Sequence, residues 1–582
     1  MSKLKSLMQK IGETPILFSL ISSFLTLFLG TIVYRPFFEE NDDVTLALIT
    51  EGAFGKHDYH MVYCNVILGK LTEGLSILIS GVRWHTVLQY LFVFLAMIIA
   101  SYVLAHYRNG RMMAVFMELA CFYELYVSFQ YTKNAVFISA VGIYAILHHL
   151  HLKYRVPASM IIPFSKKGKR FVLVMGYILL LYGMLLRDSA FYIGVVLALI
   201  PAFFDFICKI SKTGIRKMVP YVCYIAPVFV VLLLCTFVDN AVYNSNPGWS
   251  YFCDYNEART QIADYKYFNL EYDKYGDELS ELGISENDAY LYLTHQYADE
   301  SVVDIDLYNA ITAIDGRKID IDLIKAWVAD IYNDVFRLSP IVLAFGMMLL
   351  IILISSRSFS LGFLTAFGEA FLVTLMSFYY EFSGRWNHRL IYSTLLGGFV
   401  MLLLFYAVWD DDFYESGGRK RSSMSKTATL TIAIGIGLVA FASFSERLGN
   451  EFDYQSYLRN EKDFTVLQMY MEEKKDTLFV LDTFTAANQY TYDVFNPVEQ
   501  GALDNFVSTG GWLTASPIMK DIVSKYGYED PFDALKHGDN VILVDNTCPD
   551  RKAIYLSDHG AGPRYAAEFI ETICGYNLYR IN

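Results

Sequence analysis

Long apolar runs constrain this chain more than any other feature. A hydrocarbon core about 30 Å thick is crossed by roughly 20 apolar residues in a helix, and about eleven runs approach that length. The runs are 16–34, 86–107, 112–129, 134–150, 171–186, 190–207, 218–238, 340–355, 361–379, 390–408 and 427–444. Because 54% of the residues are hydrophobic and only 18% are charged, the chain is predicted to be an α-helical multi-pass membrane protein.

The distribution of basic residues predicts how the chain is oriented. Loop 151–170 carries Lys and Arg but no acid, and the N-terminal tail, 209–217 and 419–426 are also basic. With eleven spans all four segments fall on one side, which the positive-inside rule assigns to the cytoplasm. We therefore expect a plasma-membrane protein with a cytoplasmic N-terminus and an extracytoplasmic C-terminal domain.

This pattern divides the chain into four parts. Residues 1–238 form an N-terminal transmembrane module with an outer loop at 35–85, and 239–339 form an acidic extracytoplasmic insertion that is expected to be helical. Residues 340–444 supply the C-terminal transmembrane helices, and 445–582 form an extracytoplasmic soluble domain. Within the insertion, Ser285 is expected to cap a helix, because its side-chain oxygen can accept an exposed backbone N–H.

The soluble C-terminal part has the pattern of a small α/β domain. Continuous apolar runs at 476–482 and 540–545 predict buried strands, 516–525 predicts a helix, and 565–573 with 576–581 predicts a hairpin. Cys548 and Cys574 lie near the ends of neighbouring predicted strands and are expected to pair in an oxidising compartment, with free buried cysteines as the alternative.

Several function classes lack their sequence signals. No basic domain is present to neutralise phosphates, so nucleic acid is not an expected partner. The cysteines do not have CxxC spacing, which argues against a structural zinc site. No Gly-rich phosphate loop supports nucleotide binding.

Loop 35–85 is the first candidate site, because Glu39, Glu40, Asp42 and Asp43 follow directly on a hydrophobic span. Two carboxylates 4 Å apart repel by about 4 kcal/mol at an effective dielectric near 20, and such repulsion favours proton uptake by a general base. The alternative is that Asn41, Asp42 and Asp43 cap a helix starting at Val44, since Asn and Asp are favoured at that position. Further along, the helical pattern 61–79 has a thin polar stripe and a broad apolar face, typical of a helix lying at the membrane interface.

Five cations predicted on the outer face form the second candidate site: Arg187, Arg385, Arg389, Lys133 and His388. Cations on this side run against the usual charge bias. Arginine can donate two parallel hydrogen bonds to a phosphate, so the set is interpreted as a lipid-phosphate site. Each cation taken alone could instead anchor a span end at the headgroups, and Arg83 is open to both interpretations.

The layout of spans, outer loop and paired acids resembles the GT-C glycosyltransferases over residues 10–410. The resemblance implies transfer of a sugar, with inversion, from a polyprenyl-phosphate donor to a cell-surface glycan or lipid acceptor. It implies Asp42 as the base on the acceptor hydroxyl and Asp43 as the second acid. A divalent metal, Mg²⁺ or Mn²⁺, remains open as a cofactor, and no signature assigns a subfamily, sugar or acceptor.

Two other functions remain open. A transporter or flippase for a lipid-linked sugar would need the cations but no base, and a non-catalytic surface-glycan assembly protein would act through its soluble parts. A transporter typically carries ionisable groups near the membrane midplane and internal repeats. Because the outer charges gather at span ends and no repeat is evident, the sequence favours the enzyme.

The topology is tested by labelling a single cysteine introduced at position 300. We expect an impermeant thiol reagent to modify it in intact cells, because the acidic insertion is placed outside. Modification only after lysis would reverse the topology.

Overall fold

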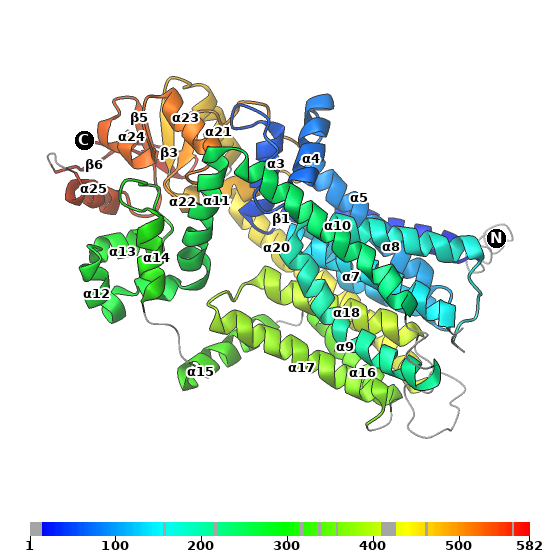
Figure 1. Ribbon diagram of the computed structural model, residues 1–582. Coiled ribbons are helices and arrows are strands. Elements are labelled where there is room, and N and C mark those ends of the chain that lie inside the picture. Colours follow the sequence, from blue (N-terminus) through cyan, green and yellow to red (C-terminus); the bar gives the residue numbers. More distant parts are fainter. Residues whose placement is uncertain are drawn as a thin grey trace.

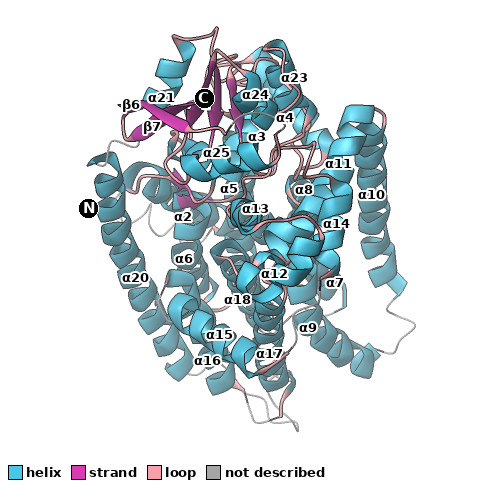
Figure 2. Cartoon of the chain, turned by 90° about the vertical axis from the view of Figure 1, so that its left-hand side faces the viewer, coloured by secondary structure: helices cyan, strands magenta, loops and turns pink. Residues whose placement is uncertain are grey.

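The computed structural model describes residues 14–154, 157, 159–213, 219–314, 319–335, 339–356, 359–408, 426–459, 464–560 and 564–582. Helices form a long bundle, and a layered α/β domain sits at one end of it beside the outer-loop helix α3 (Asn41–Glu51) (Figure 1). A second view shows the strands gathered at that end and the helices filling the rest (Figure 2).

The chain is a multi-pass membrane protein, as predicted. Within the described residues, nine helices are long and apolar enough to span a membrane. These spans are Pro15–Val33 (α2 and η1), Trp84–Leu104 (α5), Tyr131–Lys153 (in α7), Lys166–Leu186 (α8), Asp188–Ile207 (in α9), Val222–Asn244 (in α10), Leu361–Phe382 (α17), His388–Val408 (α18) and Thr427–Glu446 (in α20). The structure does not describe the basic side chains of the N-terminal tail, of 209–217 or of 419–426.

Two of the predicted spans are shorter helices in the same bundle. The run 112–129 becomes α6 (Gly110–Phe122), which passes into a π turn at Tyr123–Val127. The run 340–355 becomes α16 (Pro340–Ser355), a helix of 16 residues. Each packs against α20 (Lys426–Arg459), so both belong to the bundle although neither reaches the length of the other spans.

Several helices begin at residues whose chemistry favours a helix start. Ser165, Ser339 and Ser360 each accept a backbone N–H from the first turn of α8, α16 and α17. These bonds satisfy donors that would otherwise have no partner. Proline occupies the first turn of α16, where its missing N–H costs nothing.

The centre of the bundle is α18, whose apolar stretch is buried along its whole length. Beside it, α7 (Tyr131–Tyr154) packs closely on α8 through small residues. A Cβ added at Gly142 would lie 2.8 Å from the Leu180 nitrogen, and one at Gly176 would lie 3.0 Å from Ala145 Cβ. Small residues at these positions let the two helix backbones approach. The helix α10 (Val219–Asn244) lies at the periphery, since only 11% of its apolar stretch is buried.

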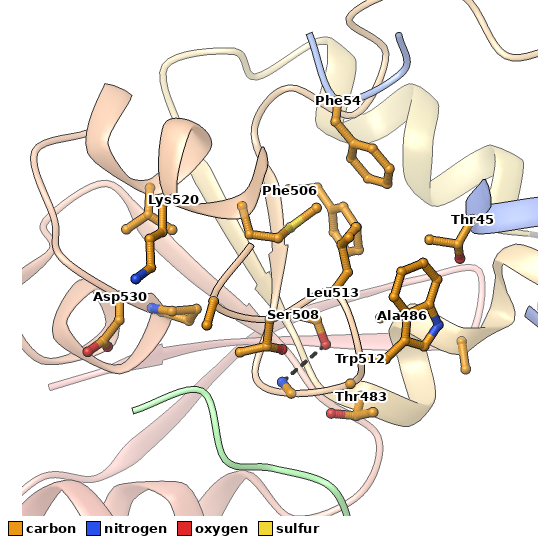
Figure 3. Close-up of a pocket in the computed structure, with 18 of the residues that line it drawn as sticks. Thr45, Phe54, Thr483, Ala486, Phe506, Ser508, Trp512, Leu513, Lys520 and Asp530 are labelled. Atoms are coloured by element: carbon orange, nitrogen blue, oxygen red, sulfur yellow. Dashed lines mark hydrogen bonds between the residues drawn. The ribbon is translucent and has the colours of Figure 1, made fainter. Parts of the chain in front are cut away.

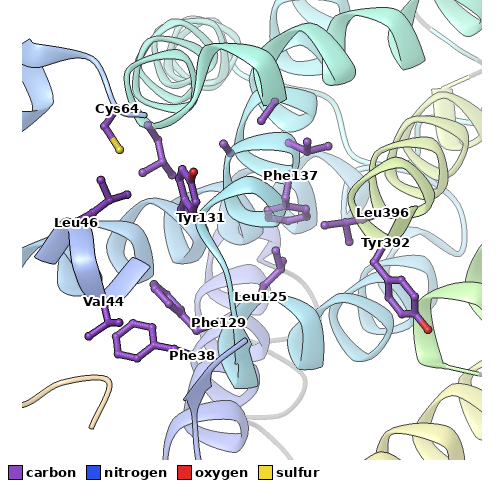
Figure 4. Close-up of a cluster of buried hydrophobic side chains, with 14 of the residues drawn as sticks. Phe38, Val44, Leu46, Cys64, Leu125, Phe129, Tyr131, Phe137, Tyr392 and Leu396 are labelled. Atoms are coloured by element: carbon purple, nitrogen blue, oxygen red, sulfur yellow. The ribbon is translucent and has the colours of Figure 1, made fainter. Parts of the chain in front are cut away.

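The outer loop is fixed to the bundle by a short parallel strand pair and an apolar cluster. Strand β1 (Phe37–Phe38) pairs with β2 (Ser128–Phe129). Phe38, Val44 and Phe129 are buried in the cluster around them (Figure 4). Helix α3 starts at Asn41, not at Val44, with Glu40 as its N-cap and no side-chain cap bond. The capping alternative for Asp42 and Asp43 is therefore wrong, because both lie inside the first turn.

The second outer helix, α4 (Val66–Leu78), exposes its apolar face. It begins later than predicted, after Asn65, whose side chain accepts the Ile67 N–H. The small and polar side faces the protein, where a Cβ at Gly69 would lie 1.9 Å from the Tyr59 carbonyl oxygen. Ile67, Leu71 and Leu78 are exposed, which suits a helix lying at the membrane interface.

The insertion is helical, as predicted. Its helical elements are α11 (Pro247–Thr260), η4 (Gln261–Tyr265), η5 (Tyr267–Leu270), α12 (Tyr272–Glu281), α13 (Glu286–Leu293), α14 (Ile305–Ala313), α15 (Ile321–Asp330) and η6 (Ile331–Val335). Ser285 caps α13 in a reciprocal arrangement with Asp288, which confirms the predicted helix start.

The C-terminal domain is built on a five-stranded sheet of order β4-β3-β5-β7-β6. Its strands are β3 (Leu478–Leu481), β4 (Phe506–Ser508), β5 (Val541–Val544), β6 (Ala567–Ile573) and β7 (Tyr576–Ile581). Its helical elements are α21 (Phe464–Glu472), α22 (Thr483–Ala487), η7 (Asn488–Thr491), α23 (Pro517–Lys525), α24 (Pro531–His537) and α25 (Pro549–Asp558). Strands β4, β3 and β5 are parallel, and β7 joins antiparallel to β5. The α/β prediction is confirmed, although the sequence analysis named no strand at β4.

The predicted hairpin turns at Cys574 and Gly575, which both have positive φ (46° and 79°). This left-handed pair suits a two-residue turn between β6 and β7. Cys548 and Cys574 are both free, so their predicted pairing is wrong. Cys548 instead lies at the start of α25, with its Sγ 3.6 Å from the Lys552 Nζ.

A buried ion pair fastens the outer loop to the C-terminal domain. Arg83 Nε donates to Glu51 Oε1 at 2.8 Å, and Arg83 Nη1 donates to the Asp493 carbonyl oxygen at 2.7 Å. The Val498 N–H donates to the other Glu51 oxygen at 3.0 Å. Arg83 is fully buried, so it is neither a phosphate ligand nor a headgroup anchor.

We expect Arg83→Met to lower the free energy of unfolding by about 3–5 kcal/mol, because it leaves the Glu51 carboxylate buried without its partner. Thermal unfolding of the purified protein measures the change. Lys325→Met is the matched control, since Lys325 pairs with Asp322 at 2.8 Å on the exposed surface, where ion pairs contribute little. Equal loss of stability in both variants would contradict the structural role of Arg83.

Candidate active site

The start of helix α7 organises the end of the bundle that lies next to helix α3. The fully buried Asp43 accepts the Tyr131 N–H at 3.0 Å and the Gln89 amide at 3.1 Å. His85 Nε2 lies 3.5 Å from the same carboxylate. Asp43 therefore holds α3 against α5 and α7, and its oxygens are engaged by the protein.

Asp42 points away from Asp43 and pairs with an arginine from α18. The Arg389 Nη1 donates to Asp42 and also to Glu40. The acid that shares a cation with Asp42 is thus Glu40, not its sequence neighbour Asp43. Burial, opposed by Arg389 and reinforced by Asp42, raises the pKa of Glu40 to about 7.

Lys133 and His388 belong to a separate network centred on Glu39. Lys133 Nζ contacts Glu39, Glu124 at 2.6 Å and Ser128 Oγ at 3.1 Å, so its three N–H groups have protein acceptors. His388 Nδ1 lies 2.9 Å from the Glu39 carboxylate. Burial acts to raise the pKa of Glu39, but Lys133 and His388 together hold this pKa well below its usual range. Both residues serve this network and are poorly placed to bind a ligand phosphate.

Arg187 differs from the other cations because its partners are neutral. Its Nη1 donates to the Tyr131 hydroxyl and to Thr132 Oγ1 at 3.0 Å, and its Nε donates to Ser189 Oγ at 3.1 Å. Its guanidinium lies 4.6 Å from the Tyr131 ring centroid. Among the described residues, no carboxylate lies within ion-pair distance of this buried arginine. Arg187 therefore keeps its charge available to an anion.

Arg385 faces the insertion. Its Nη1 donates to the Tyr265 hydroxyl, and its Nη2 lies 3.7 Å from Asp264. The structure thus pairs Arg389 with Asp42 and places Arg187 within electrostatic reach of Glu40. Lys133 and His388 lie in the adjoining Glu39 network, and Arg385 lies on the border with the insertion.

Arg259 and Tyr63 are functional candidates that the sequence analysis missed. Arg259 is buried on α11 and donates to the Tyr297 hydroxyl and to Asn256, each at 2.9 Å. Tyr63 lies within electrostatic reach of Arg259, Asp42 and Arg187, and burial raises its pKa to about 12. A lone arginine in the acid-rich start of the insertion was the available signal for Arg259.

The residues do not fit a divalent cation between Asp42 and Asp43. Mg²⁺ and Mn²⁺ prefer several open oxygen ligands. Asp43 is engaged by two donors, and Asp42 is paired with Arg389. Among the described residues, no group of three or more His, Cys, Asp or Glu side chains is arranged to hold a metal ion.

No family model and no curated protein match this sequence. Two crystal structures of ArnT from Cupriavidus metallidurans are similar to it. In each comparison the sequence identity is 9%, and the similar region covers 97% of both chains. The apo structure has a TM-score of 0.45, and the structure bound to undecaprenyl phosphate has a TM-score of 0.39. Because both scores lie below 0.5, this similarity assigns no role to any residue of the chain.

Proposed function

We propose that this protein is a membrane glycosyltransferase. It takes a sugar from a polyprenyl-phosphate donor and transfers it to a hydroxyl of a cell-surface glycan or lipid on the extracytoplasmic side. The observation that carries the proposal is a cluster at one end of the bundle, where Arg389 pairs with Asp42 and Glu40 while Arg187 donates to Tyr131 within electrostatic reach of Glu40.

The two arginines have different tasks in this proposal. Arg187, whose partners among the described residues are all neutral, binds the donor phosphate and stabilises the charge that grows on it as the sugar leaves. Arg389 is drawn partly toward the same phosphate, which frees Asp42 from its ion pair. Arg385 orders the insertion at the border of the site, while Lys133 and His388 hold the loop through Glu39.

Asp42 acts as the base in a single displacement. The acceptor oxygen attacks the anomeric carbon on the face opposite the phosphate, the bond from that carbon to the phosphate oxygen breaks, and the acceptor proton passes to the Asp42 carboxylate. Such a displacement inverts the anomeric configuration. The arginines neutralise the leaving group, so no step requires a divalent metal.

The experiment that tests the proposal incubates the purified protein with a panel of polyprenyl-phosphate sugars, with and without candidate glycan and lipid acceptors. Release of polyprenyl phosphate together with a new glycoside supports transfer. An unchanged donor across the whole panel contradicts it.

A lipid-linked sugar transporter is the second candidate, because two acids are buried inside helices of the bundle. Glu118 accepts hydrogen bonds from Ser22, Ser23 and Ser101 at 2.6–3.1 Å. Both oxygens of the buried Glu369 lack a hydrogen-bond partner among the described residues. Buried ionisable groups at such depth are typical of transport proteins. Movement of an unmodified lipid-linked sugar across reconstituted vesicles would favour this candidate.

We expect Asp42→Asn to lower turnover by about 10²–10⁴-fold, because a positioned base contributes that much to the attack of a hydroxyl. Donor binding and folding should remain, since the amide nearly matches the carboxylate in shape. Asp43→Asn should act mainly on folding, because its carboxylate anchors Tyr131 and Gln89. Radiolabelled transfer at matched expression measures both variants, and near-normal turnover by Asp42→Asn would remove this loop as the catalytic centre.

The raised pKa of Glu40 predicts a pH dependence. Below about pH 7 Glu40 is protonated, so Arg389 pairs with Asp42 alone and weakens it as a base. As the pH rises through about 7, ionised Glu40 competes for Arg389 and turnover should increase. Glu40→Gln should abolish this rise, while Glu278→Gln, at an exposed acid of the insertion, should keep it. The same rise in both variants would contradict the role given to Glu40.

A further inference from the structure

A pocket opens at the carboxyl ends of the parallel strands β3 and β4. Its volume is about 690 Å³, including its open mouth. Thr483 follows β3, and Ser508 ends β4 (Figure 3). Ligand sites of parallel α/β sheets lie at this edge, where the strands end and the loops diverge.

Three distant segments build the walls. The outer loop contributes Asn41, Thr45 and Phe54, the insertion contributes Glu300, and the C-terminal domain contributes the rest. The walls are held together by backbone contacts. The Ala298 N–H donates to the Thr509 carbonyl oxygen at 2.9 Å. A Cβ at Gly510 would lie 1.7 Å from the His295 carbonyl oxygen, so only glycine fits there.

The lining combines aromatic faces with hydroxyl groups. Phe54, Phe506 and Trp512 line the pocket beside Ser508 (Figure 3). Thr514 also belongs to the lining. Thr514 is buried, and its Oγ1 has no hydrogen-bond partner among the described residues. A buried hydroxyl without a partner is costly unless a ligand or water completes it. The lining therefore suits a molecule that has both an apolar face and hydroxyl groups.

The charges of the pocket disfavour a phosphate. Among its described lining residues, Lys520 is the one cation, and its Nζ lies 2.8 Å from Glu300. Glu529 and Asp530 add further carboxyl groups. An anion would thus meet no unpaired cation among these lining residues, whereas in the proposed catalytic site it would meet Arg187.

The pocket borders the proposed catalytic site directly. Asn41 lines the pocket and precedes Asp42 in the chain. The Trp512 ring lies 5.0 Å from the Tyr63 ring, and Tyr63 lies 5.6 Å from the Arg187 guanidinium. A ligand on the Trp512 side can therefore extend toward Asp42.

We propose that this pocket binds a neutral saccharide, and that this saccharide is part of the glycosyl acceptor. The second half of this inference rests on the proposed function; the binding itself does not. Trp512 supplies the stacking face, and Thr514 supplies a hydroxyl that has no hydrogen-bond partner in the described part of the chain. The phosphate-bearing donor occupies the arginine side, so the two substrates are separated by charge.

The test measures saccharide binding to the full chain in phosphatidylcholine nanodiscs, because sugar-based detergents would compete. The probes are methyl glycosides of glucose, galactose, mannose and N-acetylglucosamine, with glucose 6-phosphate as the anionic counterpart, observed by saturation-transfer NMR and calorimetry. We expect at least one neutral glycoside to bind more tightly than glucose 6-phosphate.

Two variants locate the binding. Trp512→Ala should weaken it by at least about tenfold, as expected for loss of a central aromatic contact. Thr514→Val should weaken it by about 2–10-fold without loss of stability, because it removes a hydroxyl that is unpartnered among the residues the structure describes. Trp327→Ala is the matched control, since that indole donates to Ser377 on α17, outside the pocket. It should bind like the wild type.

No binding by any neutral glycoside, tighter binding of glucose 6-phosphate, or equal affinity in the wild type, Trp512→Ala and Thr514→Val would each overturn the inference. The binding assay contains no lipid donor, so its outcome is separate from the transfer assay. Binding that depends on Trp512 in a protein that turns over no donor would retain the pocket and remove the proposed function. Sugar transfer without such binding would retain the proposed function and remove the pocket as a saccharide site.

Discussion

Compensation of buried charge is the constraint on which the outer end of this molecule depends. A charge removed from water without a partner costs several kcal/mol. Arg389 of α18 is matched by Asp42 and Glu40, and Lys133 of α7 is matched by Glu39 and Glu124. Because Asp42, Glu40 and Glu39 of the outer loop are matched by cations from α18 and α7, these acids are positioned only when the bundle has assembled. The same pairs that stabilise the loop therefore place the acids where a base is needed.

Arg187 is the exception that gives the site its chemistry. Its hydroxyl partners satisfy N–H groups without neutralising the guanidinium, so the charge remains for an external anion. Lys520 shows the opposite arrangement in the neighbouring pocket, where Glu300 neutralises it. Tyr63 and Trp512 stand between the two regions. A charged substrate and an uncharged one can therefore be held side by side without competing for the same groups.

The soluble parts are components of this site, not appendages to the bundle. The insertion meets the sheet domain at Ala298 and Gly510, and the outer loop meets it through the Arg83–Glu51 pair. Backbone bonds from Gly501 to Gly52 and from Leu503 to Ala53 add to that contact. Since the pocket needs all three segments, changes in how they dock would alter its shape as well as the stability of the fold.

The sequence by itself determined the membrane class, the strands β3 and β5, the turn at Cys574 and Gly575, and the helix start at Ser285. Each of these depends on local patterns: apolar length, strand-forming runs, turn residues and caps. It also brought Asp42, Arg187 and Arg389 to attention, because charges beside apolar spans are conspicuous.

The three-residue strand β4 is too short to produce a pattern, and Arg259 acquires its role only when α11 packs beside Tyr297 and Tyr63. Tertiary structure alone decided that Asp42 pairs through Arg389 with Glu40 while Asp43 anchors Tyr131. Successive side chains of a helix point in different directions, so two carboxylates that are adjacent in the chain need not share a partner. Asp42 and Glu40 are instead joined by the guanidinium of Arg389, which comes from α18, far along the sequence.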